Sequence, residues 1–329
     1  MTVCIHIGAG KTATTTLQNH LFLAHPQIEY LGRPYRDPRM RDLFNHLASA
    51  DSIEYDAATC RALFAEVIAP RLAGPKLVLV SDEGLSFNAF HTDRRLIAER
   101  LFDLFGPSKI VMTVRNQFSA IESYYVNHAR RQKQCPACLG TVTASFHRWL
   151  AHSITHASTG YLASLKYFEL ARTYAEIFGR ANVRIILFED FVNAPARFFD
   201  ELCGFIGVDA AIAPALVAGR DAKPRIRQRA MTYERLRALL PGEIAFSRFL
   251  PAVVVRRFRL FLEGGPAAKV DMSRKELAFI ARYYAESNRR LAAEFGLALA
   301  AYGYPLPPGK DARQAAGGGP VAVHCSTVG

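Results

Sequence analysis

Four short apolar runs constrain the fold of this 329-residue chain more than any other feature; the first ends in a glycine-rich turn and the other three in polar residues. They span residues 3–7, 77–80, 109–114 and 183–188, and helical stretches separate them. A run that is apolar throughout is typical of a strand buried on both faces of a parallel sheet. The sequence therefore predicts an α/β fold, with a central, mostly parallel β-sheet flanked by helices on both faces.

The remaining periodic segments are helical, and they dominate the C-terminal part of the chain. We expect helices at residues 11–25, 57–72, 118–131, 194–206, 229–240, 253–262 and 273–295. Residues 33–56 show little periodicity, so we expect surface loop and short helix there. Residues 253–262 interleave arginines with apolar side chains, which predicts an amphipathic helix packed on the sheet. We expect a single domain at 1–305 and a mobile tail at 306–329.

Composition narrows the possible partners without selecting one. The chain has 41 Lys and Arg against 29 Asp and Glu, a formal net charge of +12, which favours an anionic partner such as a phosphate-rich cofactor, an acidic glycan, nucleic acid or an anionic membrane. No recognised nucleic-acid module is present, so we expect no nucleic-acid partner. No stretch approaches the roughly 18 apolar residues of a membrane span. The N-terminal residues lack the features of a secretory signal, and we expect a cytoplasmic location with six reduced cysteines.

The first apolar run leads into a turn with the sequence Gly8-Ala9-Gly10-Lys11-Thr12-Ala13-Thr14-Thr15-Thr16. Backbone N–H groups at a strand-to-helix turn, the positive end of the helix dipole, the Lys11 ammonium and threonine hydroxyls all favour a bound phosphate. A threonine-rich helix start with a solvated lysine is the plainer alternative. We interpret the turn as a phosphate site.

The same turn only partly fits a nucleotide-binding P-loop. That motif, G-x-x-x-x-G-K-[ST], requires a glycine at position 5, where this chain has Ile5 inside the apolar run. Asp82, which follows the second run, could still hold Mg²⁺ as in nucleotide-dependent kinases. A kinase therefore stays open as an alternative.

The third apolar run ends at Arg115-Asn116, and Ser123, Tyr124 and Tyr125 follow in the next expected helix. Two helical turns would bring the Ser123 hydroxyl back toward the Arg115 guanidinium, and a guanidinium fork beside a hydroxyl suits a second phosphate. The sequence thus predicts two anion sites at neighbouring strand ends, which is where open parallel sheets bind ligands.

Together these motifs resemble the sulfotransferases that use 3′-phosphoadenosine-5′-phosphosulfate (PAPS). The 5′-phosphosulfate loop of that family reads strand, Lys-[Ser/Thr/Gly]-Gly-Thr-Thr, helix, and residues 11–15 match it apart from Ala13. The family's 3′-phosphate motif is Arg-Asn, a serine eight residues after the arginine, then Tyr-Tyr, which residues 115–125 match. Further similarity lies in residues 160–167 and 188–190. The resemblance covers residues 1–207, with a weaker echo at 288–304.

The resemblance implies a P-loop-like sulfotransferase fold with a helical C-terminal portion. It implies transfer of the sulfonate group from PAPS to an acceptor hydroxyl without a metal, leaving adenosine 3′,5′-bisphosphate (PAP). Lys11 would neutralise charge on the oxygen between sulfonate and departing phosphate. The cofactor-binding residues implied are Gly10, Lys11, Thr12, Ala13, Thr14 and Thr15 at the 5′ end, with Arg115 and Ser123 at the 3′-phosphate. Because Ala13 replaces a glycine, we expect a negative φ at that residue.

Sulfonate transfer also needs a base for the proton of the acceptor hydroxyl. In cytosolic relatives a histidine just past the second conserved strand has this role, and in the glycosaminoglycan-directed branch of the family a glutamate has it. Ser81-Asp82-Glu83 follows the second run here, so we predict that Glu83 is the catalytic base and Asp82 the reserve. An acidic residue that caps a helical turn is the alternative role for Glu83.

Two further signals remain open. Cys135 and Cys138 have the spacing of zinc ligands, but no second pair accompanies them, so we expect ordinary thiols, with a metal or a disulfide as alternatives. A basic cluster consists of Arg220, Lys223, Arg225, Arg227 and Arg229. It could close over the 3′-phosphate, receive an acidic acceptor or simply be solvated.

We therefore predict a PAPS-dependent sulfotransferase. A kinase that needs ATP and Mg²⁺, and a non-catalytic module for anionic nucleotides or glycans, are the rivals, and neither explains the spacing from Arg115 to Ser123. The acceptor could be a carbohydrate, lipid, peptide or small alcohol, and the positive charge favours an anionic one. The sequence indicates no oligomeric state.

Overall fold

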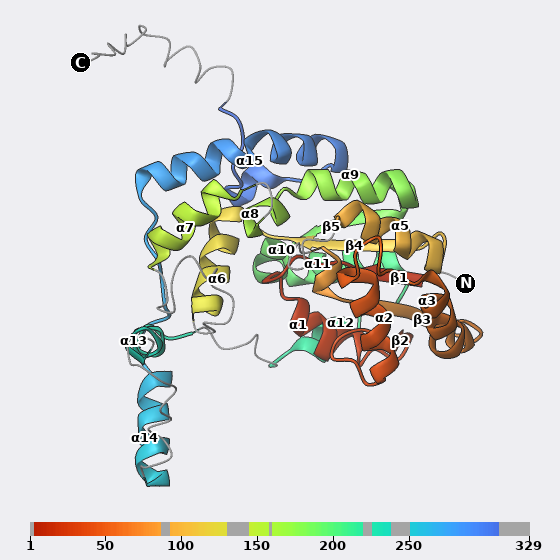
Figure 1. Cartoon of the computed structure of the whole chain (residues 1–329), viewed down its shortest axis with the longest axis horizontal. Coiled ribbons are helices and arrows are strands. Elements are labelled where there is room, and N and C mark those ends of the chain that lie inside the picture. The colour runs from red at the N-terminus through yellow and green to blue at the C-terminus, as the bar shows by residue number, and fades with distance from the viewer. Residues whose placement is uncertain are drawn as a thin grey trace, which may run out of the picture.

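The computed structural model describes residues 3–86, 93–129, 145–157, 160–219, 226–237 and 251–308. At its centre lies a five-stranded sheet of order β2-β3-β1-β4-β5, in which every neighbouring pair is parallel (Figure 1). The strands are β1 (Val3–His6), β2 (Ile28–Tyr30), β3 (Leu77–Ser81), β4 (Lys109–Val114) and β5 (Val183–Leu187). The predicted α/β fold is confirmed.

The strand β2 was not expected from the sequence. It has three residues and pairs only with β3 at one edge of the sheet. A segment this short contains too few side chains to show an apolar period, whereas the four longer strands are apolar runs of four to six residues.

Successive side chains of a strand point to opposite sides of the sheet, and in this protein both sides are buried. Ile5 and Val80 pack in the larger of two apolar clusters, and Cys4 and Leu79 pack in the smaller one. The larger cluster is covered by α2 (Pro38–Ser49), α3 (Ala57–Leu63), α5 (Arg94–Phe105), α9 (Tyr167–Phe178) and α15 (Arg274–Phe295). The smaller cluster is covered by η1 (Leu17–Phe22), α11 (Pro195–Ile206) and α12 (Ala213–Val217). The predicted helices on both faces of the sheet are thus confirmed.

The other described elements connect these layers. They are α1 (Thr14–Thr16), η2 (Phe64–Ile68), α4 (Ala69–Leu72), η3 (Glu83–Leu85), α6 (Gln117–Ala129), α7 (Phe146–Thr155), α8 (Tyr161–Ser164), η6 (Arg180–Asn182), α10 (Phe188–Asn193), α13 (Gln228–Arg237), α14 (Ala252–Glu263) and η8 (Leu299–Tyr302). None of the helices that the structure describes is long and apolar enough to cross a bilayer.

The prediction that residues 253–262 pack on the sheet is wrong. These residues form α14, which lies away from the sheet next to α13 (Figure 1), and no residue of α14 is buried. The helical period of the sequence shows that the helix is amphipathic, but it does not show which surface the apolar side chains meet.

The topology places three loops at one edge of the sheet. The strand β1 lies in the middle, with β3 on one side and β4 on the other, so the strand order reverses at β1. Ligands of open α/β sheets bind at such a switch point, outside the carboxyl ends of the strands. Lys11, Glu83 and Arg115 follow β1, β3 and β4.

The end of the described chain returns to this edge. The Asn288 side chain in α15 exchanges hydrogen bonds with Gln117, at 2.8 and 3.0 Å, and donates to the carbonyl of Pro305 at 2.9 Å. Residues near the C-terminus thereby hold the first turn of α6. Of the predicted tail, only residues 306–308 are described.

Candidate active site

The loop between β1 and α1 has an unusual backbone. Lys11 and Ala13 both adopt positive φ, 74° and 61°. Turns that alternate left-handed with right-handed residues point successive N–H groups into a concavity that binds anions. Within the described part of the chain, the N–H groups of Gly10, Thr12 and Ala13 have no hydrogen-bond acceptor. The loop therefore has donors that suit a phosphate.

The expectation of a negative φ at Ala13 is wrong. Ala13 is the N-cap of α1 and sits in the left-handed region, where a Cβ is sterically unfavourable by roughly 1–2 kcal/mol.

This strain predicts that Ala13→Gly stabilises the protein. Glycine removes the Cβ clash, and its greater freedom in the unfolded chain offsets part of that gain, so we expect the free energy of unfolding to rise by about 0.5 kcal/mol. Calorimetric unfolding would measure it. Ala9→Gly is the matched control in the same loop, because Ala9 is not among the residues with positive φ. If Ala13→Gly lowered the free energy of unfolding as much as Ala9→Gly does, the backbone of Ala13 would not be strained.

A buried polar network supports the loop from below. His6 Nδ1 lies 2.7 Å from Ser81 Oγ, and His6 Nε2 lies 3.3 Å from Thr113 Oγ1. The Thr12 hydroxyl donates to the carbonyl of Ala9 at 2.6 Å and lies 2.7 Å from Thr113 Oγ1. These contacts join β1, β3 and β4 to the loop. The side chain of Thr12, which the resemblance assigned to the cofactor, thus faces the core.

Burial of His6 predicts a pH-dependent stability. Burial lowers the pKa of His6 to about 3, from 6.5, so the folded state holds a neutral imidazole. Above pH 6.5 His6 is neutral in both the folded and the unfolded chain and does not lower the free energy of unfolding. As the pH falls from 6.5 toward 3, only the unfolded chain takes up the proton, so the free energy of unfolding decreases by about 1.4 kcal/mol per pH unit.

We therefore expect His6 to remove about 2 kcal/mol of stability between pH 6.5 and pH 5. Urea unfolding at both pH values would show the loss in the wild type and in the exposed control His156→Asn. It should be absent in His6→Asn. Equal pH slopes in all three proteins would contradict the neutral, buried state of His6.

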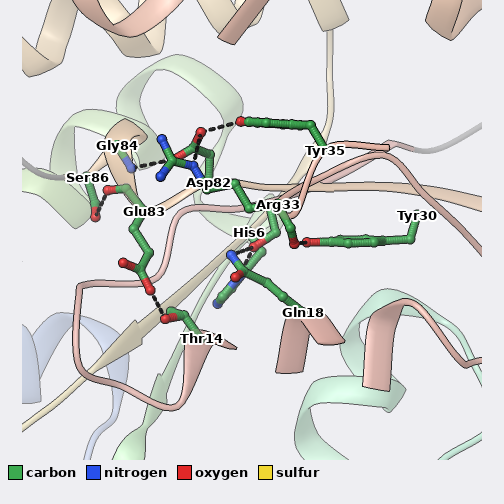
Figure 2. Close-up of polar contacts among 11 residues, drawn as sticks. His6, Thr14, Gln18, Tyr30, Arg33, Tyr35, Asp82, Glu83, Gly84 and Ser86 are labelled. Carbon is green, nitrogen blue, oxygen red and sulfur yellow. Dashed lines mark hydrogen bonds and ion pairs between the residues drawn. The ribbon is translucent and has the colours of Figure 1, made fainter. Parts of the chain in front are cut away.

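Glu83 lies beside the loop between β1 and α1. It begins η3, separated from the end of β3 by Asp82, and its Oε1 accepts a hydrogen bond from the hydroxyl of Thr14 at the start of α1 (Figure 2). A Cβ built on Gly10 would lie 3.9 Å from Glu83 Oε2, so the carboxylate also stands beside the glycine of the loop. A proton acceptor thus faces the same loop as Lys11.

Asp82 is engaged in structural contacts instead. Its Oδ1 accepts from the N–H of Gly84 at 2.7 Å, which caps η3, and its Oδ2 accepts from Arg33 Nε at 2.8 Å and from the Tyr35 hydroxyl. In Figure 2 the Asp82 and Glu83 side chains point in different directions. The capping role considered for Glu83 thus belongs to Asp82, and the buried Asp82 is poorly placed as a reserve base.

Arg115 joins the two predicted anion sites. Its NH1 donates to the carbonyl of Lys11 at 3.0 Å, its Nε donates to Ser119 Oγ at 2.8 Å, and its Cζ lies 4.5 Å from the centre of the Phe188 ring. Burial lowers the pKa of Arg115. Arg115 is half-buried and forms no ion pair with a carboxylate of the described residues, although Glu189 and Glu122 lie near enough to act on its charge. Its guanidinium can therefore still receive an anion.

The hydroxyl in contact with Arg115 is that of Ser119, whereas we expected Ser123. The helix α6 begins two residues after Arg115, so a residue in its first turn lies closest to the guanidinium. Ser123 lies one turn further along the same side of α6. The spacing that identified Ser123 gave no signal for Ser119.

Residues from later segments fix the end of β4. The Tyr167 hydroxyl donates to the carbonyl of Arg115 at 2.9 Å, and the N–H of Asn116 donates to Glu189 at 2.9 Å. The Tyr304 hydroxyl also donates to Glu189, at 2.9 Å. Tyr167 and Glu189 belong to the segments in which the sequence resembled the sulfotransferases, and here they position Arg115.

Some residues that the sequence analysis singled out are not part of the site described above. Cys135, Cys138 and the residues Arg220, Lys223 and Arg225 of the basic cluster lie outside the described residues. Arg229 is described, and its guanidinium packs 4.4 Å from the centre of the Phe261 ring on α14.

Comparison with known proteins identifies the fold. No protein-family model and no curated protein matches the sequence. Among solved structures, a sulfotransferase from Alicyclobacillus acidocaldarius superposes with a TM-score of 0.55 at 18% identity, over 92% of this chain and 98% of that chain. The chain has the sulfotransferase fold. This comparison confirms the sulfotransferase fold that the sequence motifs indicated.

Two more distant sulfotransferase structures are similar over most of this chain. The sulfotransferase domain from the curacin biosynthetic pathway has a TM-score of 0.43 at 16% identity, over 93% of this chain and 99% of that chain. Mouse SULT7A1 complexed with PAP has a TM-score of 0.39 at 14% identity, over 79% of this chain and 81% of that chain.

Proposed function

We propose that this protein transfers the sulfonate group of PAPS to a hydroxyl of an acceptor. One observation supports this most strongly: Arg115 donates to the carbonyl of Lys11, so a guanidinium and a lysine-containing phosphate loop adjoin at the switch point of a sulfotransferase fold. Two adjoining anion sites suit a nucleotide with phosphates at both ends of one ribose.

The hydrogen-bond donors and positive charges at the site suit the phosphate groups of PAPS. The N–H groups of Gly10, Thr12 and Ala13 have no acceptor among the described residues, and they would hold the 5′-phosphate together with the Lys11 ammonium. Arg115 would hold the 3′-phosphate, with Ser119 orienting its guanidinium and Ser123 one turn away. PAPS supplies an activated sulfonate group whose leaving group is a phosphate.

Glu83 would accept the proton from the acceptor hydroxyl. Its carboxylate stands over the phosphate loop, where an incoming hydroxyl can face the sulfonate in line with the leaving oxygen. The Thr14 hydroxyl has one proton, which it donates to Glu83 in this structure. That contact orients the carboxylate, and Thr14 would need to rotate to donate to a phosphate.

The surroundings of Asp82 argue against the kinase alternative. A kinase would use Asp82 to hold Mg²⁺. Both of its oxygens already accept hydrogen bonds, from Gly84 on one side and from Arg33 and Tyr35 on the other. The transfer that we propose is one without a metal. The proposal extends to an anionic acceptor, which the charge of +12 favours, and to a cytoplasmic location.

Incubation with PAPS and a panel of hydroxyl acceptors tests this function. Carbohydrates, lipids and small alcohols would be supplied without Mg²⁺, and mass spectrometry would follow PAP and the sulfated product. We expect PAP to form with at least one acceptor. The parallel reaction with ATP and Mg²⁺ is the control, and ADP formation there without any turnover of PAPS would overturn the proposal in favour of a kinase.

A further inference from the structure

A helical arm extends from the body of the molecule (Figure 1). We define it as residues 226–237 and 251–268, which contain α13 and α14. Its base is closed by two short antiparallel segments: Arg227 bridges Ala267, and the N–H of Ala268 donates to the carbonyl of Ile226 at 2.8 Å. Hydrogen bonds between its two ends therefore hold the base of the arm together.

One side of α14 holds the two helices together. Phe258 meets the ring of Tyr233 on α13 edge to face, with ring centroids 5.0 Å apart. Val255 and Leu262 are half-buried, and they lie on the same side of the helix as Phe258 at three- and four-residue spacing. This side accounts for only part of the apolar surface of α14.

A second apolar stripe on α14 faces solvent. Its side chains are exposed by 65% at Val253, 45% at Val254, 59% at Leu260 and 54% at Phe261. With Arg257, they occupy the positions i, i+1, i+4, i+7 and i+8 of one helix face. Contiguous exposed apolar side chains on a globular protein mark a binding surface.

The charges beside this stripe indicate what it binds. Arg256, Arg257 and Arg259 are exposed on α14, and Glu263 is its only acidic residue. Arginines combined with Val, Leu and Phe on an amphipathic helix are typical of helices that lie in the interface of a membrane. We propose that α14 docks on an anionic lipid bilayer, with the apolar stripe at the headgroup boundary and the arginines on lipid phosphates.

A second copy of this chain fits the stripe less well. A two-fold contact places each residue near its own counterpart, so the Arg257 side chains in the middle of the stripe would approach each other. Like charges in a water-excluded contact are unfavourable, and Glu263 is the one carboxylate on α14 to offset three arginines. The 12-residue helix is about 18 Å long, so it can lie along a bilayer surface but cannot cross it.

Vesicle co-sedimentation of the full chain tests this proposal. We expect binding to phosphatidylcholine vesicles that contain about 30% phosphatidylserine at about 0.1 M salt, and weak binding to phosphatidylcholine alone. Leu260→Ser with Phe261→Ser should weaken binding at least about tenfold, since both side chains would lose apolar contact. Replacing Arg256, Arg257 and Arg259 by Ser should weaken it by about 100-fold, near fivefold for each arginine.

The matched control is Val192→Ser on α10, because Val192 is 58% exposed, like Leu260, but lies outside the arm. It should bind vesicles as the wild type does, and circular dichroism should show the same helix content in all variants. Absence of wild-type binding to the anionic vesicles would overturn the proposal, as would unchanged binding by the Leu260 and Phe261 variant. A dimer in analytical ultracentrifugation that this variant abolishes would assign the stripe to a second copy and also overturn it.

Discussion

Glu83→Gln should lower the turnover number by about 10²- to 10⁴-fold, the usual range for loss of a general base, while PAP affinity changes by less than about twofold. The glutamine side chain has nearly the same shape and can still accept a hydrogen bond from Thr14, but it cannot take up the proton of the acceptor hydroxyl. Steady-state kinetics with PAPS, together with calorimetric titration of PAP, would separate the two quantities.

Asp82→Asn is the matched control for Glu83→Gln. The change removes a charge from a buried group that pairs with Arg33 and caps η3, so we expect a lower melting temperature and a turnover number close to that of the wild type. If Glu83→Gln kept wild-type turnover while Asp82→Asn lost it, Asp82 would be the base and our assignment would be wrong.

Arg115→Ala should weaken PAP binding by about 10- to 100-fold, as expected when a charge-assisted hydrogen bond to phosphate is lost. The loss should be much smaller for adenosine 5′-phosphate, which lacks the 3′-phosphate. Calorimetric titration of both nucleotides with both proteins would therefore show a loss of discrimination between them. Equal PAP affinity in the wild type and the variant would contradict the role of Arg115.

Conservative variants refine this prediction. Arg115→Lys keeps the charge but loses the planar fork, so we expect an intermediate PAP affinity. Ser119→Ala and Ser123→Ala test which hydroxyl belongs to the site. We expect Ser123→Ala to weaken PAP binding directly, and Ser119→Ala to act more weakly, by loosening the orientation of Arg115.

The sheet could be predicted from the sequence because burial on both faces makes each strand a continuous apolar run. The strand Lys109–Val114 is such a run, and its end at Arg115 was evident. Three-residue β2 has no such signal. The sequence also gave no information on what α14 packs against, because a helical period records an apolar face and not its partner.

The candidate site was predictable to the extent that it follows strand ends. Lys11, Glu83 and Arg115 each come directly after or near an apolar run, and parallel strands bring those ends together. The supporting contacts were not predictable. His6 meets Ser81 and Thr113 across 75 and 107 residues of sequence, and such contacts leave no local pattern.

The most direct test of the central claim is a calorimetric titration of PAP into the wild type, Lys11→Ala and Arg115→Ala without Mg²⁺. We predict one site per chain that prefers PAP to ADP by at least about tenfold, and both variants should weaken that same site, because each removes a positive charge from one nucleotide pocket. A wild-type protein that binds ADP as tightly as PAP, or PAP binding that neither variant changes, would contradict the claim.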